Sequence, residues 1–98
     1  MAREIRTTVT VCNDKGLHLK PAQKVVNLAS RFAADIKLGW DGQLVEAKST
    51  LGLLALGAGP GSELELRVRG EDAEAAAAAL AALFAAGFDP APGEEVSP

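Results

Sequence analysis

The strongest constraint on the fold is a hydrophobic pattern that switches along the chain between the period of a strand and that of a helix. Apolar and polar residues alternate over Ile5–Val11, Ile36–Trp40 and Leu64–Val68. Such alternation is typical of strands that bury one face. Asp41-Gly42, which follows the second stretch, is a strong signal for a two-residue hairpin, so a return strand is expected over about 43–47.

Helical spacing and capping residues predict two helices between these strands. Apolar residues three and four positions apart predict an amphipathic helix from about 19 to 32. Its buried stripe would comprise Ala22, Val25, Val26, Ala29 and Phe32. Ser49 is a preferred N-cap residue and predicts a short helix over 50–56, which Gly57 or Gly59 would end.

A last helix is expected to begin at an Asp72 cap and to stop near Gly87. Its apolar side is predicted to comprise Ala73, Ala76, Ala77, Leu80, Leu83 and Phe84. The element order is then β-α-β-β-α-β-α, and strands with one apolar face imply a sheet covered by helices on one side. A chain of 98 residues has room for one core, so one domain is expected over 1–88 and a disordered tail over 89–98.

Composition excludes several classes of function. The net charge is −3 without a long basic block, and only 4% of the residues are aromatic, which argues against nucleic-acid binding. The single cysteine, Cys12, rules out an intramolecular disulfide and is expected to be half-buried at the end of the first strand. No secretory signal or bilayer-spanning apolar run is visible, so a cytoplasmic protein without direct membrane insertion is predicted.

The segment Gly16-Leu17-His18-Leu19-Lys20-Pro21-Ala22 places the single histidine at the start of the first predicted helix. Pro21 suits the first turn, where backbone N–H groups have no intrahelical partner. His18 then lies at or next to the N-cap, close to the amides of Leu19 and Lys20 and to the positive end of the helix dipole, which favours a bound anion. An imidazole is largely neutral and nucleophilic at pH 7. This combination suits a phosphohistidine, although a lone histidine in a turn is more often a cap or a surface residue.

Two stretches of the sequence carry a resemblance to a known family. Gly16–Ala22 resembles the active-site stretch, and Ala47-Lys48-Ser49-Thr50-Leu51-Gly52 the regulatory-serine stretch, of the phosphocarrier protein HPr family of the bacterial phosphoenolpyruvate-dependent phosphotransferase system. The resemblance covers about 3–88. It implies an α+β fold, an open-faced β-sandwich with a four-stranded antiparallel sheet and helices on one face.

The resemblance also implies a function. His18 would accept a phosphoryl group on Nδ1 from phosphorylated enzyme I and pass it to a histidine of a downstream sugar-transport or regulatory acceptor protein. The chain would be a carrier with a phosphohistidine intermediate rather than an enzyme with independent turnover, and no cofactor or metal is expected. The Leu19 amide and Lys20 would hold the phosphate. Lys20 stands where the family usually has arginine, and it offers a compact point charge instead of a planar fork of donors.

Other positions have a structural and a functional interpretation. Ser49 is a good helix cap, and the resemblance makes it a candidate target of an HPr kinase/phosphorylase. Leu17, Leu51 and Leu54 are either core residues or an apolar patch for docking partners beside His18, with at least Leu51 and Leu54 expected to be partly exposed. A monomer suits such a shuttle. The alternative function is a regulatory binding module that signals through the Ser49 face with little or no phosphoryl relay. The retained His18 argues against it, because relatives that act only as regulators can lose that histidine.

Overall fold

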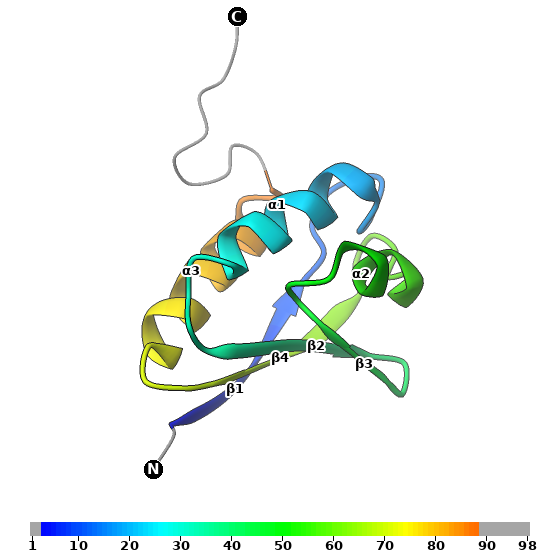
Figure 1. Cartoon of the computed structure of the whole chain (residues 1–98). Helices are drawn as coiled ribbons and strands as arrows, with labels where there is room; N and C mark the ends of the chain where they lie inside the picture. The colour runs from blue at the N-terminus through cyan, green and yellow to red at the C-terminus, as the bar shows by residue number, and fades with distance from the viewer. Residues whose placement is uncertain (1–2, 89–98) are drawn as a thin grey trace, which may run out of the picture.

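The computed structural model describes residues 3–88, which form a four-stranded antiparallel sheet with helices on one face (Figure 1). The strand order β1-β4-β2-β3 places β4 and β2 at the centre of the sheet. The elements are β1 (Glu4–Thr10), α1 (Leu19–Ala29), β2 (Asp35–Trp40), β3 (Gln43–Glu46), α2 (Thr50–Leu56), β4 (Glu63–Arg69) and α3 (Ala73–Ala85). The predicted fold class and element order are confirmed. The tail predicted over 89–98 lies outside the described residues.

The core lies between the sheet and the helices. On the two central strands the side chains that face the helices are fully buried, namely Ile36, Leu38, Leu64, Leu66 and Val68. The apolar side predicted for the last helix is confirmed, because every residue assigned to it is buried on α3. The intervening residues of β4 are charged and lie on the opposite face of the sheet, which no helix covers.

The first helix ends at Ala29, earlier than the predicted end near residue 32. The amides of Arg31 and Phe32 donate to carbonyls three residues back, at 3.1 Å each, so the chain tightens into a turn and leaves the α-helix. Phe32 nevertheless packs against the core from this turn. The apolar spacing therefore continued past the residue at which the helix stops.

Asp72 occupies the N-cap position of α3, but its side chain makes no capping hydrogen bond, so the predicted capping role was wrong. Its two carboxylate oxygens accept hydrogen bonds from the amides of Ala33, at 2.8 Å, and Ala34, at 2.9 Å. These amides belong to the turn between α1 and β2. Asp72 therefore holds the end of the first helix against the start of the last one, which local sequence signals could not reveal.

Two smaller predictions had opposite outcomes. Asp41 and Gly42 have φ of 50° and 79°, as a two-residue type I′ hairpin requires, so the predicted turn is confirmed. Cys12 is exposed rather than half-buried, because it lies beyond the end of β1 and donates its thiol hydrogen to the Thr10 carbonyl at 3.4 Å. None of the helices between residues 3 and 88 is long and apolar enough to cross a membrane.

Replacement of Asp72 tests its bridging role. Asp72→Ala removes both acceptors from the turn amides and is expected to lower the free energy of unfolding by about 1–3 kcal/mol, measured by urea denaturation. Asp72→Asn keeps only one of the two acceptor oxygens, so it should be intermediate. Glu71→Ala, at the exposed neighbouring position, should change stability by no more than about 0.5 kcal/mol. Full stability of Asp72→Ala would contradict the bridge.

Candidate functional site

The loop that leads into α1 is fixed by contact with the segment after α2. The Leu17 amide donates to the Ala58 carbonyl at 2.9 Å. Gly16 has a φ of +75°, and a Cβ there would lie 2.8 Å from the Ala58 carbonyl oxygen, so only glycine fits this position. Leu17 is buried in the core. The backbone that precedes His18 is therefore held in a fixed position.

His18 is the N-cap residue of α1, as the sequence predicted, and its backbone is extended, with φ −92° and ψ −168°. Its amide donates to the Gly16 carbonyl at 3.0 Å, and its carbonyl accepts from the Ala22 amide at 2.9 Å. The side chain is exposed and makes no capping hydrogen bond. The backbone of His18 is thus held on both sides while its imidazole is presented to solvent.

The first turn of α1 is suited to an anion. The amides of Leu19 and Lys20 have no acceptor within the helix, and Pro21 has no N–H group. The first turn contains no acidic residue, whereas Lys20 lies in it. Backbone donors, the helix dipole and a lysine charge therefore act together beside the imidazole of His18.

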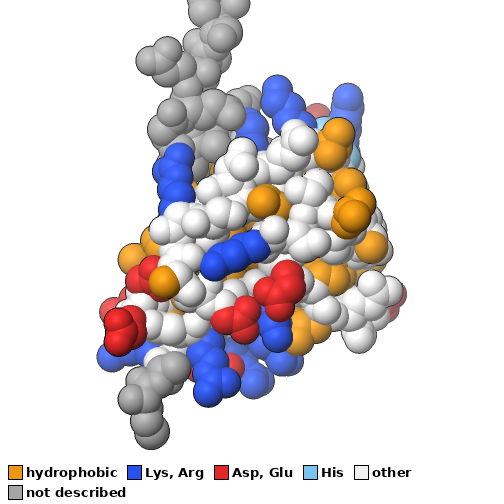
Figure 2. Space-filling view, viewed as in Figure 1, with side chains coloured by type: hydrophobic (Ala, Val, Ile, Leu, Met, Phe, Trp, Pro, Cys, Tyr) orange, Lys and Arg blue, Asp and Glu red, His pale blue; other side chains and the backbone are white. Residues whose placement is uncertain are grey.

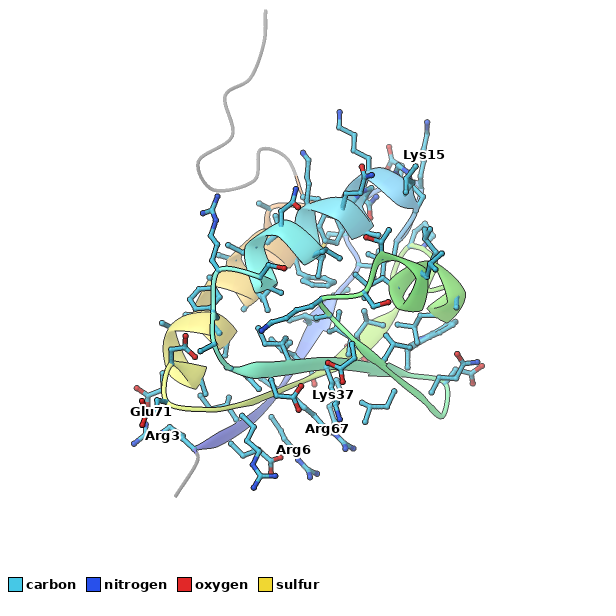
Figure 3. All side chains as sticks on the ribbon, in the orientation of Figure 1. Arg3, Arg6, Lys15, Lys37, Arg67 and Glu71 are labelled. Carbon is cyan, nitrogen blue, oxygen red and sulfur yellow. The ribbon has the colours of Figure 1, made fainter. Side chains whose placement is uncertain are left out.

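A shallow hollow of about 220 Å³ opens beside the histidine. Among the described residues its walls are Asn13, His18, Lys20, Pro21, Lys24, Gly87 and Phe88. Lys24 lies one helical turn after Lys20, and its Nζ donates to the Phe88 carbonyl at 2.8 Å. Figure 3 shows the labelled Lys15 at the same end of the molecule. The site is thus rich in lysine, and none of the described residues lining the hollow is acidic.

Asn13 braces the loop from within. Its Nδ2 donates to the Gly16 carbonyl at 2.8 Å, so this carbonyl accepts both the Asn13 side chain and the His18 amide. The opposite amide orientation would place two acceptors face to face, which fixes the assignment of Nδ2 and Oδ1. Oδ1 is buried and has no hydrogen-bond partner among residues 3–88.

Ser49 is the N-cap of α2, and its Oγ accepts the Gly52 amide at 3.0 Å. The predicted capping role and the helix bounds are confirmed. The side chain is only partly buried. Because α2 packs beside the N-terminal part of α1, Ser49 caps a helix that adjoins the histidine site (Figure 1).

Exposed leucines lie near the histidine. Leu51 is 80% exposed, Leu19 is 52% exposed and Leu54 is partly buried. Figure 2 shows apolar side chains gathered beside the pale-blue histidine. Leu17 does not belong to this patch, because only 4% of it is exposed, so the expectation of a surface role for it was wrong. It precedes the helix and points inward, whereas Leu19, assigned only an amide role from the sequence, takes its place on the surface.

Sequence reasoning also missed Lys24 and Phe88. The position of Lys24 was readable, since residues four apart lie on the same face of a helix. Phe88 reaches the site through tertiary contacts that no local pattern encodes. Its ring meets Phe84 edge to face, with centroids 4.9 Å apart, and its amide donates to the Leu83 carbonyl at 3.0 Å.

Comparisons with known proteins agree with this geometry. The family model described as the PTS HPr component phosphorylation site matches residues 5–86. A crystal structure of HPr from Thermoanaerobacter tengcongensis is 36% identical with a TM-score of 0.83, covering 94% of this chain and 99% of that one. The phosphocarrier protein HPr from Bacillus anthracis is 42% identical with a TM-score of 0.77, covering 81% and 94%. Crh, the Bacillus subtilis catabolite repression containing protein, crystallised as a domain-swapped dimer, is 37% identical with a TM-score of 0.69, covering 85% and 95%.

The fold and the matched family place this chain among the phosphocarrier proteins, which transfer a phosphoryl group between other proteins. The chain belongs to the HPr family of the phosphoenolpyruvate-dependent phosphotransferase system. Its partners are proteins of that system, such as enzyme I and the sugar-specific components.

Proposed function

We propose that His18 is the residue that carries the phosphoryl group in this phosphocarrier. The observation that supports it most directly is an exposed imidazole with no capping hydrogen bond, placed at a helix N-terminus whose first amides lack acceptors. The Leu19 amide, the Lys20 amide and the Lys20 ammonium would hold the phosphate oxygens. The site is on the protein surface, as transfer between two proteins requires.

The transfer moves a phosphoryl group from a phosphorylated donor to an unphosphorylated imidazole. The lone pair of His18 Nδ1, the nitrogen that the family resemblance implies, attacks the phosphorus held by phosphorylated enzyme I. A new N–P bond forms as the bond to the donor group breaks, and the electron pair of that bond returns to the donor. In the second step a histidine of the acceptor protein attacks the phosphorus on His18, and the electron pair of the N–P bond returns to His18. The helix amides stabilise the charge that the phosphoryl group brings to His18.

Substitutions at His18 and Lys20 test this assignment. Incubation with enzyme I and phosphoenolpyruvate should add one acid-labile phosphate by intact mass, and His18→Ala should add none. Lys20→Gln should slow phosphorylation by about 10- to 100-fold, because a hydrogen bond to a charged group is worth about 1.5–3 kcal/mol, while Lys20→Arg should keep the rate.

Lys37→Gln, which removes a lysine from the uncovered face of the sheet, is the matched control and should behave like the parent chain (Figure 3). A phosphate that survives His18→Ala would contradict the assignment. So would equal rates for Lys20→Gln and Lys37→Gln.

We also propose that Leu19, Leu51 and Leu54 form the docking patch for partner proteins. Leu51, at 80% exposed, contributes almost nothing to the core and can bury its whole side chain in a complex. A carrier must leave each partner quickly, so a small patch of this kind suits weak, short-lived complexes better than a large interface.

Leu51→Ser tests the patch. It should weaken binding to enzyme I by about 10- to 100-fold, because burying a leucine side chain is worth about 1.5–3 kcal/mol, with little change in the free energy of unfolding. Leu44→Ser removes an exposed leucine from β3, on the edge of the sheet, and should leave the dissociation constant unchanged. The dissociation constants are measured by isothermal titration calorimetry. Equal losses for the two variants would contradict the docking role.

Ser49 is proposed as a second, regulatory phosphorylation site for an HPr kinase/phosphorylase. Ser49 is partly exposed at a surface that adjoins the docking patch. A phosphate there would place charge beside Leu51. The protein is further proposed to act as a cytoplasmic monomer, which suits a shuttle between partners.

With ATP and an HPr kinase, the parent chain should gain an acid-stable phosphate that Ser49→Ala does not gain. Ser49→Ala should also lose about 1 kcal/mol of stability with its cap. Thr50→Ala, which removes the neighbouring hydroxyl, should still be phosphorylated. An unmodified parent chain, in an assay that phosphorylates another HPr, would exclude this regulation.

A further inference from the structure

The described chain ends at the phosphoryl site. Gly87 and Phe88 form one wall of the hollow that His18 and Lys20 line. Phe88 is fixed there, because its ring is buried against Phe84 and its carbonyl accepts from Lys24 Nζ at 2.8 Å. Phe88, the last described residue, therefore lies at the rim of the proposed anion site.

The segment that begins at this rim is acidic. Residues 89–98 read Asp-Pro-Ala-Pro-Gly-Glu-Glu-Val-Ser-Pro, with carboxylates at Asp89, Glu94 and Glu95 and no lysine or arginine. The family match ends at residue 86, before this segment begins. Glu94 lies six residues beyond Phe88, which at about 3.4 Å per extended residue gives it a reach of about 20 Å. This reach is long enough for the Glu94 carboxylate to contact the hollow, because Phe88 itself lines the hollow.

The hollow presents the complementary charge. Lys20 and Lys24 stand four residues apart on α1, on the same face of the helix. Lys20 lies in the first turn of α1, at the positive end of the helix dipole, where cations are unfavourable and carboxylates favourable. No carboxylate from residues 3–88 lines the hollow, so its described walls are positively charged. An anion bound at the first turn would be favoured by Lys20 and by the helix dipole.

We propose that the hollow beside His18 is a docking surface for the chain's own acidic segment 89–98, whose carboxylates compete there with the incoming phosphoryl group. The proposal rests on His18 being the phosphorylated residue. In the unphosphorylated protein, Glu94 or Glu95 binds at the first turn of α1, and Lys24 holds the start of the segment through the Phe88 carbonyl. Phosphorylation of His18 displaces the carboxylates, so the segment lowers the rate at which His18 is phosphorylated.

The test uses the full chain with Asp89→Asn, Glu94→Gln and Glu95→Gln combined. A matched control with the same charge change combines Glu4→Gln, Asp41→Asn and Glu71→Gln; Figure 3 places the labelled Glu71 at the opposite end of the molecule from Lys15. Amide signals of Leu19 and Lys20 in ¹⁵N–¹H spectra should shift in the tail variant and stay in place in the control. These shifts should not depend on protein concentration, as an intramolecular contact requires.

The second measurement is the initial rate of phosphorylation by enzyme I. At low salt the tail variant should be phosphorylated about three- to tenfold faster than the parent chain. The factor is modest because exposed ion pairs are individually weak. The advantage should shrink in high salt, where the screening length falls to about 3 Å at 1 M. Unchanged Leu19 and Lys20 signals, shifts that vanish on dilution, or equal rate increases in the two variants would overturn the proposal. If no variant or parent is phosphorylated on His18, the proposed function fails instead, while the spectra still report separately on docking.

Discussion

The hydrogen bond from the Leu17 amide to the Ala58 carbonyl fixes the position of the histidine site, and much of the surrounding structure depends on it. Two bonds nearby extend this tie. The Val11 amide donates to the Ser62 carbonyl at 2.9 Å, and the Gly61 amide donates to the Val11 carbonyl at 2.7 Å. They join the loop before α1 to the segment between α2 and β4. The place of His18 is therefore set by α2 and the sheet as well as by its own helix, and buried Leu17 anchors the loop from the core side.

The charges at the start of α1 support the proposal that this end of the helix binds an anion. An isolated helix prefers acidic residues in its first turn, and a like-charge pair four residues apart destabilises a helix by about 0.2–0.5 kcal/mol. Here the first turn lacks acids, and Lys20 and Lys24 form such a pair. An anion bound at the first turn would offset this cost. Affinity for phosphate or for a carboxylate is therefore the common physical basis of the proposed relay and of the competition inferred for residues 89–98.

Local sequence patterns predicted the elements well, because the signals that set them are local. The bounds of α2 follow from Ser49 and Gly57, and the hairpin follows from Asp41-Gly42. The position of His18 at the start of α1 could also be predicted, since the histidine, the proline and the helix start are adjacent in sequence. The errors concern side chains whose partners lie far along the chain. Asp72 bonds to a distant turn instead of its own helix, and Phe88 reaches the site only through packing on α3.

Leu17 and Leu19 show the same limit within a single motif. The two leucines flank His18, and nothing in their spacing distinguishes the buried one from the exposed one. The distinction arises because the chain passes under Ala58 before the helix begins, which turns Leu17 towards the core and Leu19 towards solvent. Periodicity applies only within a regular element, and the motif straddles the end of one. The expected exposure is therefore confirmed for Leu51 and Leu54, whereas Leu17 is buried.

The capping role of Ser49 determines how a phosphate there would act. Its Oγ already accepts the Gly52 amide at the N-terminus of α2, and a phosphate on this oxygen would bring further acceptor oxygens and negative charge to the end of the helix that favours both. The helix should therefore remain folded. The added charge would instead lie beside Leu51, which α2 holds on the surface, and would have to be desolvated together with the leucine whenever a partner docks. A phosphate at Ser49 would thus lower the affinity for partners. It would leave α1 and the backbone donors beside His18 unchanged.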